Sequence, residues 1–322
     1  MNRVATYNSY GSPEVVEISS QPIPPVGEHQ IRIRVAAAGV NPLDWKLVRG
    51  DLRWFRRGPW PRLLGCDFAG VVDAVGSAVP GWCEGQAVFG SLRDPLSGRR
   101  GSYGGWLTAE PAEVVEVPAG VSLELGAALP VAGASALQCL EMAGVKAGDE
   151  VLIIGATGGV GSFATVLATA RGARVTAVCR ERNEAYARQL GAARVLAHDR
   201  VDPLDDPARY DAILDLAGAH DFDRCGPRLK PRGRYVLSTP GTSDYLAAWR
   251  SRLVGGPRAY GLAVRRDRAS MRQLAALAAA GTFDRIALST FALDDARKAL
   301  EQSRSGGVRG KILLAPTANL QS

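Results

Sequence analysis

The clearest hydrophobic pattern in the chain is a short apolar run that ends in glycine. Residues 151–155 are apolar and largely β-branched, which is typical of a strand buried on both faces of a parallel sheet. A glycine-rich stretch, 156–161, follows, and residues 162–170 then have the pattern of a helix. Glycine lets the backbone approach a pyrophosphate, and the N–H groups at the start of a helix hold phosphates. The pattern predicts a dinucleotide site at Thr157, Gly158, Gly159 and Val160, the alternative being a tight junction without a ligand.

A second buried strand, residues 173–178, indicates which dinucleotide binds. Sites that prefer NAD usually have a carboxylate at the end of this strand, for the ribose 2′-hydroxyl. Here the strand ends at Cys179, and Arg180 and Arg182 flank the nearby acid, Glu181. Two guanidinium groups favour a 2′-phosphate, so we expect NADPH rather than NADH. In the alternative, both arginines are solvated residues at a helix N-terminus.

The rest of the pattern divides the chain into three parts. Up to about residue 120, short alternating runs separated by glycine and proline predict a compact β domain. Helical residues 125–143 and further short strands then predict an α/β sheet, before mixed elements return. We therefore expect a catalytic domain at 1–122 and 266–322, interrupted by a nucleotide-binding domain at 123–265.

Composition narrows the class of protein. The chain has 322 residues and a net charge of +7, and its basic residues are scattered, which argues against nucleic acid as the ligand. Its five cysteines form no CxxC pair, which predicts a reducing compartment. Neither an apolar N-terminal leader nor a membrane-spanning apolar run is evident, so we expect a cytoplasmic protein without membrane contact.

Several motifs together resemble the zinc-independent quinone oxidoreductase branch of the medium-chain dehydrogenase/reductase family. The resemblance covers nearly the whole chain and rests on residues 39–46, 61–72, 130–136, the glycine turn and 310–314. It implies an α/β fold in which a GroES-like β-barrel lies beside a Rossmann doubly wound parallel sheet. The active site of such a protein lies in the cleft between the two domains.

The residues at the expected metal position argue against zinc. Zinc-dependent relatives have a cysteine where this chain has Asn41, and Gly-His-Glu where it has Gly65, Cys66 and Asp67. A catalytic zinc needs three protein ligands, and an amide is a poor one. We therefore expect no metal.

Without a metal, another group must stabilise the charge that develops on a carbonyl oxygen as hydride adds to a conjugated quinone, enone or enal. The resemblance makes Lys46 the first candidate and Asn41 the second, as an amide donor. Asp44 either orients Lys46 or caps a surface helix. Quinone oxidoreductases often have tyrosine at the position of Lys46, and enoyl-thioester reductases have their proton-donating tyrosine at the position of Leu52. Because this chain has neither tyrosine, the proton for the reduced substrate would come from Lys46 or water.

The resemblance also implies further contacts and an assembly. Ser135, His198, Ser238 and Lys311 match cofactor-contacting or cleft positions of relatives, although His198 is equally consistent with an exposed loop. Relatives dimerise through their last Rossmann strands, so we expect a homodimer paired through residues 259–264.

Residues 49–62 contain five arginines and three aromatic residues. They suit either a solvated loop packed on the barrel or a cleft rim for an anionic or aromatic substrate. The same composition leaves open an RNA-binding member of the family. Two further alternatives are a scaffold protein without catalysis and a biosynthetic enoyl reductase that acts on a carrier-bound or CoA-linked intermediate.

Overall fold

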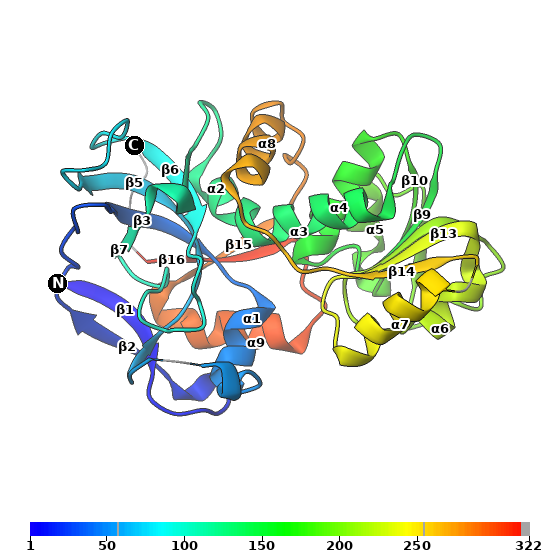
Figure 1. The fold of residues 1–322 in the computed structure, drawn as a ribbon, viewed down its shortest axis with the longest axis horizontal. Helices are drawn as coiled ribbons and strands as arrows, with labels where there is room; N and C mark the ends of the chain where they lie inside the picture. The colour runs from blue at the N-terminus through cyan, green and yellow to red at the C-terminus, as the bar shows by residue number, and fades with distance from the viewer. Residues whose placement is uncertain (57, 254, 317–322) are drawn as a thin grey trace.

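The protein consists of a β-rich part and a parallel α/β sheet, side by side along its longest axis (Figure 1). The computed structural model describes residues 1–56, 58–253 and 255–316.

The β-rich part is built from the first strands of the chain and the last two. One sheet has the order β15-β16-β3-β5-β6-β8, with β7 also paired to β3, and a smaller one has the order β2-β1-β4. Buried aliphatic and aromatic side chains from these strands form one core. The strands are β1 (Asn2–Tyr7), β2 (Val16–Gln21), β3 (Ile31–Gly39), β4 (Arg62–Leu63), β5 (Asp67–Val75), β6 (Ala87–Ser91), β7 (Trp106–Ala109), β8 (Val114–Glu116), β15 (Leu288–Ala292) and β16 (Lys311–Ala315).

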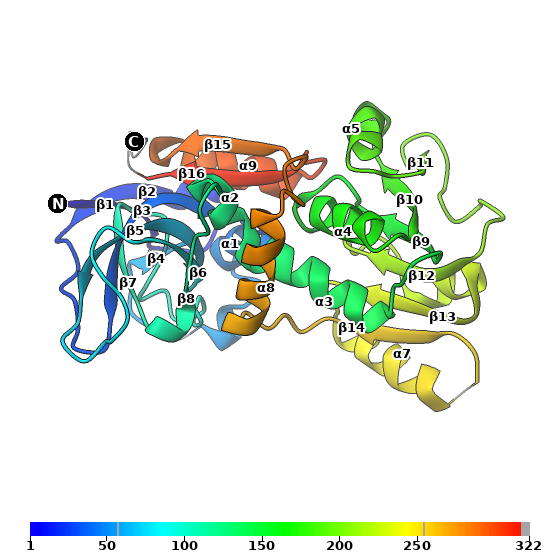
Figure 2. The ribbon, with the colours of Figure 1, turned by 90° about the horizontal axis from the view of Figure 1, so that it is seen from above.

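The α/β part contains a six-stranded parallel sheet of order β11-β10-β9-β12-β13-β14, the doubly wound order of dinucleotide-binding folds. Side chains of α3, α4 and α5 share a core with one face, while the other face packs with α6 and α7 (Figure 2). The strands are β9 (Glu150–Ile154), β10 (Arg174–Cys179), β11 (Arg194–Ala197), β12 (Tyr210–Asp215), β13 (Leu229–Leu237) and β14 (Arg258–Gly261). The helices are α3 (Ala134–Ala143), α4 (Gly159–Ala170), α5 (Glu184–Gln189), α6 (Phe222–Cys225) and α7 (Thr242–Leu253).

A continuous helical segment connects the two parts. It runs from α2 (Leu123–Ala128) through a π-helical stretch, Leu129–Gly133, into α3. This segment, Leu123–Ala143, has the length and hydropathy of a membrane span, but 78% of its most apolar window is buried inside the protein. This finding differs from the expectation that no apolar run approaches the length of a membrane span. Because most of the segment is buried inside the protein, its apolar composition is explained by packing in the core.

The chain returns to the β-rich part through α8 (Arg268–Ala279), β15, α9 (Ala296–Ser305) and β16. β16 pairs with the end of β3, which leads into α1 (Pro42–Arg49). Gly310 N, just before β16, donates to Thr157 O of the glycine turn at 2.8 Å. The final strand therefore holds α1 and the glycine turn next to each other.

One helix and one strand boundary differ from the expected pattern. The strand expected at 259–264 is the shorter β14, and α7 precedes it without a matching amphipathic pattern. Apolar side chains of α7 point outward, with Tyr245, Leu246 and Trp249 being 50%, 58% and 58% exposed. Because apolar residues lie on the exposed side of α7, hydrophobic periodicity could not reveal it.

Candidate active site

A cavity of about 480 Å³ lies where the carboxyl ends of the Rossmann strands meet α1 and β16. In an open parallel sheet this edge, beside the point where the strand order reverses, is where ligands bind. Its lining comes from the start of α1, the glycine turn, the ends of β10, β12 and β13, and the α9–β16 loop. Of the residues that the sequence predicts for the site, those that line this cavity are Asn41, Lys46, Thr157, Gly158, Gly159, Val160, Cys179, Arg180, His198 and Lys311.

The glycine turn has the shape that a pyrophosphate requires. Gly155 adopts a left-handed φ of 79°, and a Cβ on Gly161 would lie 2.0 Å from Gly155 O. Both positions therefore exclude other residues. Gly158 and Gly159 line the cavity at the N-terminus of α4, where the positive end of the helix dipole favours an anion. The residues present thus fit a dinucleotide.

Buried side chains fix the glycine turn and the neighbouring loop after β12 through hydrogen bonds. Thr157 O accepts from Ser162 Oγ at 3.1 Å, and Thr157 Oγ1 accepts from Asn183 Nδ2 at 3.3 Å. Asp215, buried at the end of β12, accepts four successive backbone N–H groups that begin at Ala217. Asn183 and Asp215 belong to no short motif, so only their proximity in the fold reveals them.

The end of β10 exposes arginine to the cavity and keeps the neighbouring acid away from it. Cys179 is buried, which raises the pKa of its thiol to about 11. Arg180 lines the cavity, whereas Glu181 forms an ion pair with Arg200 at 2.6 Å. Arg182 contacts Gly307 O at 3.4 Å and does not line the cavity.

Asp44 caps α1 from a buried position, not from the surface. Its Oδ2 accepts from Asn41 N and from Tyr103 Oη, both at 2.7 Å. Burial raises the pKa of this carboxyl from 3.8 to about 6. Asp44 makes no hydrogen bond to Lys46, so it holds the start of the helix and not the lysine.

The Asn41 amide is engaged on both sides. Its Oδ1 accepts from Lys311 Nζ at 2.5 Å, and its Nδ2 donates to Asp67 Oδ2 at 2.9 Å. Lys311 Nζ also donates to Val40 O at 2.8 Å, and burial lowers the pKa of this lysine. Because Nδ2 is directed toward Asp67, Asn41 is held as a positioning residue on the cavity wall, and its role as an amide donor to cofactor or substrate stays a prediction.

The residues at the zinc position of metal-dependent relatives do not fit a metal ion. Burial, followed by the charge of Asp67, raises the pKa of the Cys66 thiol well above 9.0, which disfavours the thiolate that zinc needs. The Oδ1 atom of Asn41 already accepts a hydrogen bond from the Lys311 ammonium group. Among residues 1–56, 58–253 and 255–316, no cluster of three or more His, Cys, Asp or Glu side chains could hold a metal.

Lys46 is a cation of the cavity wall that remains available to a ligand. It is half-buried, lines the cavity from α1, and its Nζ lies 5.7 Å from the centre of the Trp45 ring. Within the described part of the chain its ammonium group makes no hydrogen bond or ion pair. The geometry therefore leaves its N–H groups free to meet an oxygen.

Other expected positions lie outside the cavity lining. Ser135 and Ser238 do not line it, whereas Thr239, one residue beyond Ser238, does. No described residue of 50–62 lines it, and Arg57 lies outside the described residues. The end of α9 lines it with Ser303 and Arg304, and the α9–β16 loop lines it with Gly306, Gly307 and Val308, a contribution that no motif indicated.

The described part of 50–62 is divided between packing and exposure. Arg56 donates to Tyr7 Oη at 2.5 Å, and Arg62 donates to Tyr10 Oη at 2.6 Å, both arginines being buried. Trp54 and Phe55, in contrast, are 83% and 69% exposed. The arginines therefore anchor this segment to the barrel.

A GroES-like barrel beside a Rossmann sheet, with a glycine-turn cavity between them, defines a two-domain medium-chain dehydrogenase/reductase. Comparisons with known proteins agree. Residues 27–119 match the family model of the alcohol dehydrogenase GroES-like domain, and 190–314 match that of the zinc-binding dehydrogenases.

Individual relatives narrow the class. A chloroplast envelope quinone oxidoreductase homolog of Arabidopsis thaliana is 34% identical over 246 residues, 73% of this chain and 74% of the relative. The 2-methylene-furan-3-one reductase of Solanum lycopersicum is 33% identical over 219 residues, 66% of this chain and 56% of the relative. The quinone oxidoreductase of Coxiella burnetii has a solved structure with a TM-score of 0.85 at 29% identity, covering 98% of this chain and 99% of that one. The chain belongs to the quinone oxidoreductase-like medium-chain dehydrogenases/reductases, oxidoreductases that use a pyridine nucleotide.

Proposed function

We propose that the protein reduces a carbon–carbon double bond conjugated to a carbonyl group, with NADPH as the reductant and without a metal. The observation that carries this proposal is Lys46, a cation without an ion-pair partner among the described residues, on a cavity shared with the glycine turn. The names of the tomato reductase and of the two quinone oxidoreductase relatives support the same substrate class.

The chain's own residues provide charge stabilisation at the carbonyl end of the substrate. Bound NADPH supplies a hydride for the β-carbon. Negative charge then develops on the carbonyl oxygen, where the Lys46 ammonium donates a hydrogen bond. A conjugated system spreads that charge over several atoms, so one cation can suffice where a simple ketone would require a metal or a tyrosine that protonates the alkoxide. Lys46 or a water molecule then donates a proton to the α-carbon of the enolate, and where Lys46 is the donor it takes up a proton from solvent to restore its ammonium group.

The choice of NADPH rests on the end of β10. Arg180 faces the cavity, the acid beside it is paired with Arg200, and Cys179 replaces the carboxylate that would bind a ribose 2′-hydroxyl. All five cysteines are free, which supports a reducing compartment such as the cytosol.

A substrate panel tests the function. Quinones, enones, enals, simple ketones and alcohols are offered with NADPH and, in parallel, with NADH, while cofactor absorbance is followed. We expect turnover of conjugated carbonyls with NADPH and little with simple ketones. Oxidation of alcohols without reduction of enones or quinones would contradict the proposal.

Chelation tests the metal-free mechanism. Because the donor set at Asn41, Cys66 and Asp67 does not fit zinc, activity is expected to be unchanged after treatment with EDTA and dialysis. Lost activity that zinc restores would show that a metal takes part.

A further inference from the structure

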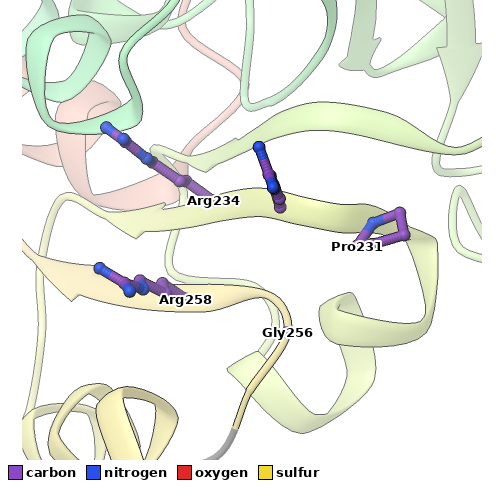
Figure 3. A pocket seen from close by; sticks show the side chains of 5 residues that line it. Pro231, Arg234, Gly256 and Arg258 are labelled. Carbon is purple, nitrogen blue, oxygen red and sulfur yellow. The ribbon is translucent and has the colours of Figure 1, made fainter.

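A second cavity, of about 560 Å³, lies beside β13 and the amino end of β14 in the Rossmann sheet (Figure 3). It is lined by Pro231, Arg232 and Arg234 of β13, and by Gly256 and Arg258 at the start of β14. Arg258 begins β14 and Arg234 is its register partner on β13, whereas the active-site cavity is at the carboxyl ends of the strands. The two cavities share no lining residue.

The strand register brings the arginines together around the cavity. Arg232 and Arg234 are two residues apart in β13, and both line the cavity. Arg234 is the register partner of Arg258 on the adjacent parallel strand. Figure 3 shows the Arg234 and Arg258 side chains extending in the same direction from neighbouring strands. Adjacent like charges on a sheet destabilise it unless a counter-charge is present.

Among the described residues, the protein supplies no counter-charge in this cavity. None of the lining residues that the structure describes carries a carboxylate. The Arg234 side chain donates to Met142 O at 3.1 Å, while the guanidinium groups of Arg232 and Arg258 form neither a hydrogen bond nor an ion pair with the described residues. The carboxylate of Asp211, on the neighbouring strand β12, is already paired with Lys230 at 2.6 Å.

Guanidinium groups bind carboxylate and phosphate oxygens through paired N–H donors, so three of them around one cavity match a ligand that carries several such oxygens. We propose that Arg232, Arg234 and Arg258 form a binding site for a small, multiply charged anion, either a phosphate ester or a polycarboxylate, separate from the active site. The five lining residues include no aromatic ring on which a nucleic-acid base could stack. A small anion is therefore favoured over a nucleic-acid strand.

Calorimetric titration with inorganic pyrophosphate and with citrate tests the site and separates the two anion classes. The protein is first saturated with its dinucleotide, so that the phosphate-binding turn is filled. We expect one pyrophosphate or citrate per chain. Arg232→Gln and Arg258→Gln should each weaken binding by about tenfold or more, the loss of one charge-assisted hydrogen bond. Arg188→Gln, on the exposed surface of α5, is the matched control and should bind as the wild type does.

Thermal unfolding gives a second readout. Pyrophosphate or citrate should raise the unfolding temperature of the wild type and not that of Arg258→Gln. Without ligand, Arg258→Gln should unfold no lower than the wild type, because it removes a like-charge neighbour of Arg234.

Several results would overturn the proposal. They are the absence of binding by either anion at millimolar concentration, equal binding by the wild type and both variants, or a lower unfolding temperature of unliganded Arg258→Gln. Tighter binding of a single-stranded oligonucleotide that depends on Arg258 would also overturn it, by identifying a macromolecular ligand. None of these results bears on the reductase activity, because the active-site cavity shares no residue with this one.

Discussion

Two lysines line the active-site cavity, and their partners give them different roles. Lys311 donates to Val40 O and Asn41 Oδ1 and is fully enclosed, so its charge is used inside the protein. Lys46 is half-buried and has no such partner among the described residues. A free ammonium can donate to a developing oxyanion, whereas an engaged one can only fix the residues around it.

Replacing Lys46 by methionine should separate catalysis from binding. Lys46→Met keeps much of the side-chain bulk and removes the charge, so turnover of an enone should fall by about 10²–10³, the usual loss for one oxyanion donor. NADPH binding, measured by fluorescence, should stay near the wild-type value. Lys146→Met, at an exposed position outside the cavity, serves as the control. Wild-type turnover in Lys46→Met would remove this lysine from the mechanism.

Removing the arginines after β10 should change cofactor preference. Arg180→Ala combined with Arg182→Ala should weaken NADPH binding and leave NADH binding nearly unchanged, because only NADPH carries the 2′-phosphate. Arg180 should account for most of the loss, since it lines the cavity and Arg182 does not. Kd values for both cofactors, with each single variant and the pair, provide the measurement. Equal wild-type affinity for NADPH and NADH would contradict the prediction.

At the scale of elements, α1 is the part of the site that depends on a buried charge. Asn41 and Asp44 form its capping box, and Tyr103 donates to the same carboxylate oxygen. Asp44 Oδ1 is buried without a hydrogen-bond partner among the described residues. The cap that positions Lys46 is therefore held by a carboxyl group that is costly to ionise.

This cost predicts a pH-dependent stability. The pKa of Asp44 is about 6 in the folded protein against 3.8 as a free group, so the folded state binds the proton more tightly. Its contribution is fully present below about pH 3.8 and is lost as pH rises through about 6. Asp44→Asn removes this pH-dependent contribution to the free energy of unfolding. The unfolding free energy of the variant relative to the wild type should therefore rise by on the order of 3 kcal/mol between pH 4 and pH 7.

Urea unfolding at a series of pH values measures this difference. Asp51→Asn is a control of opposite sign, because Arg49 lowers the pKa of Asp51 and its contribution is lost as pH falls. A parallel pH dependence of Asp44→Asn and the wild type would show that the Asp44 carboxyl does not titrate in this way.

How much of the fold the sequence could predict also differs between elements. The glycine turn, β9, β10 and the cap of α1 follow from local patterns, because each depends on residues close together in the chain. The role of Asp67 beneath Asn41 and the donation by Tyr103 depend on contacts between distant segments, which no local pattern specifies. The α9–β16 loop lines the cavity because β16 pairs beside β3, a consequence of topology.

At the scale of the whole molecule, two sheets are needed to make one site. The β-rich part provides Lys46 and Lys311, and the Rossmann part provides the glycine turn. The hydrogen bond from Gly310 N to Thr157 O connects these two contributions directly. A ligand in the cavity therefore contacts residues from both ends of the chain, which couples its binding to the relative position of the two parts.

The outer edge of the Rossmann sheet leads to the last prediction, a homodimer. β14 ends the strand order, so one side of it has no neighbouring strand among the described residues. Unpaired strand edges invite pairing with another chain, and a two-fold axis beside β14 would let two copies pair with each other. α7 packs next to this strand and exposes Leu246 and Trp249, apolar surface that a second copy would cover. We therefore expect a continuous sheet across two protomers.

Light scattering after size-exclusion chromatography should give twice the chain mass of 34.0 kDa at micromolar concentration. Leu246→Lys combined with Trp249→Lys places like charges on both sides of the two-fold axis and should shift the species toward monomer. Val201→Lys changes another exposed apolar residue, 54% exposed in the loop that follows β11, the strand at the other end of the sheet order, and should leave the mass unchanged. A wild-type monomer would contradict the prediction. A dimer that persists in the double variant would show that α7 lies outside the interface, while pairing through β14 itself would remain consistent with the mass.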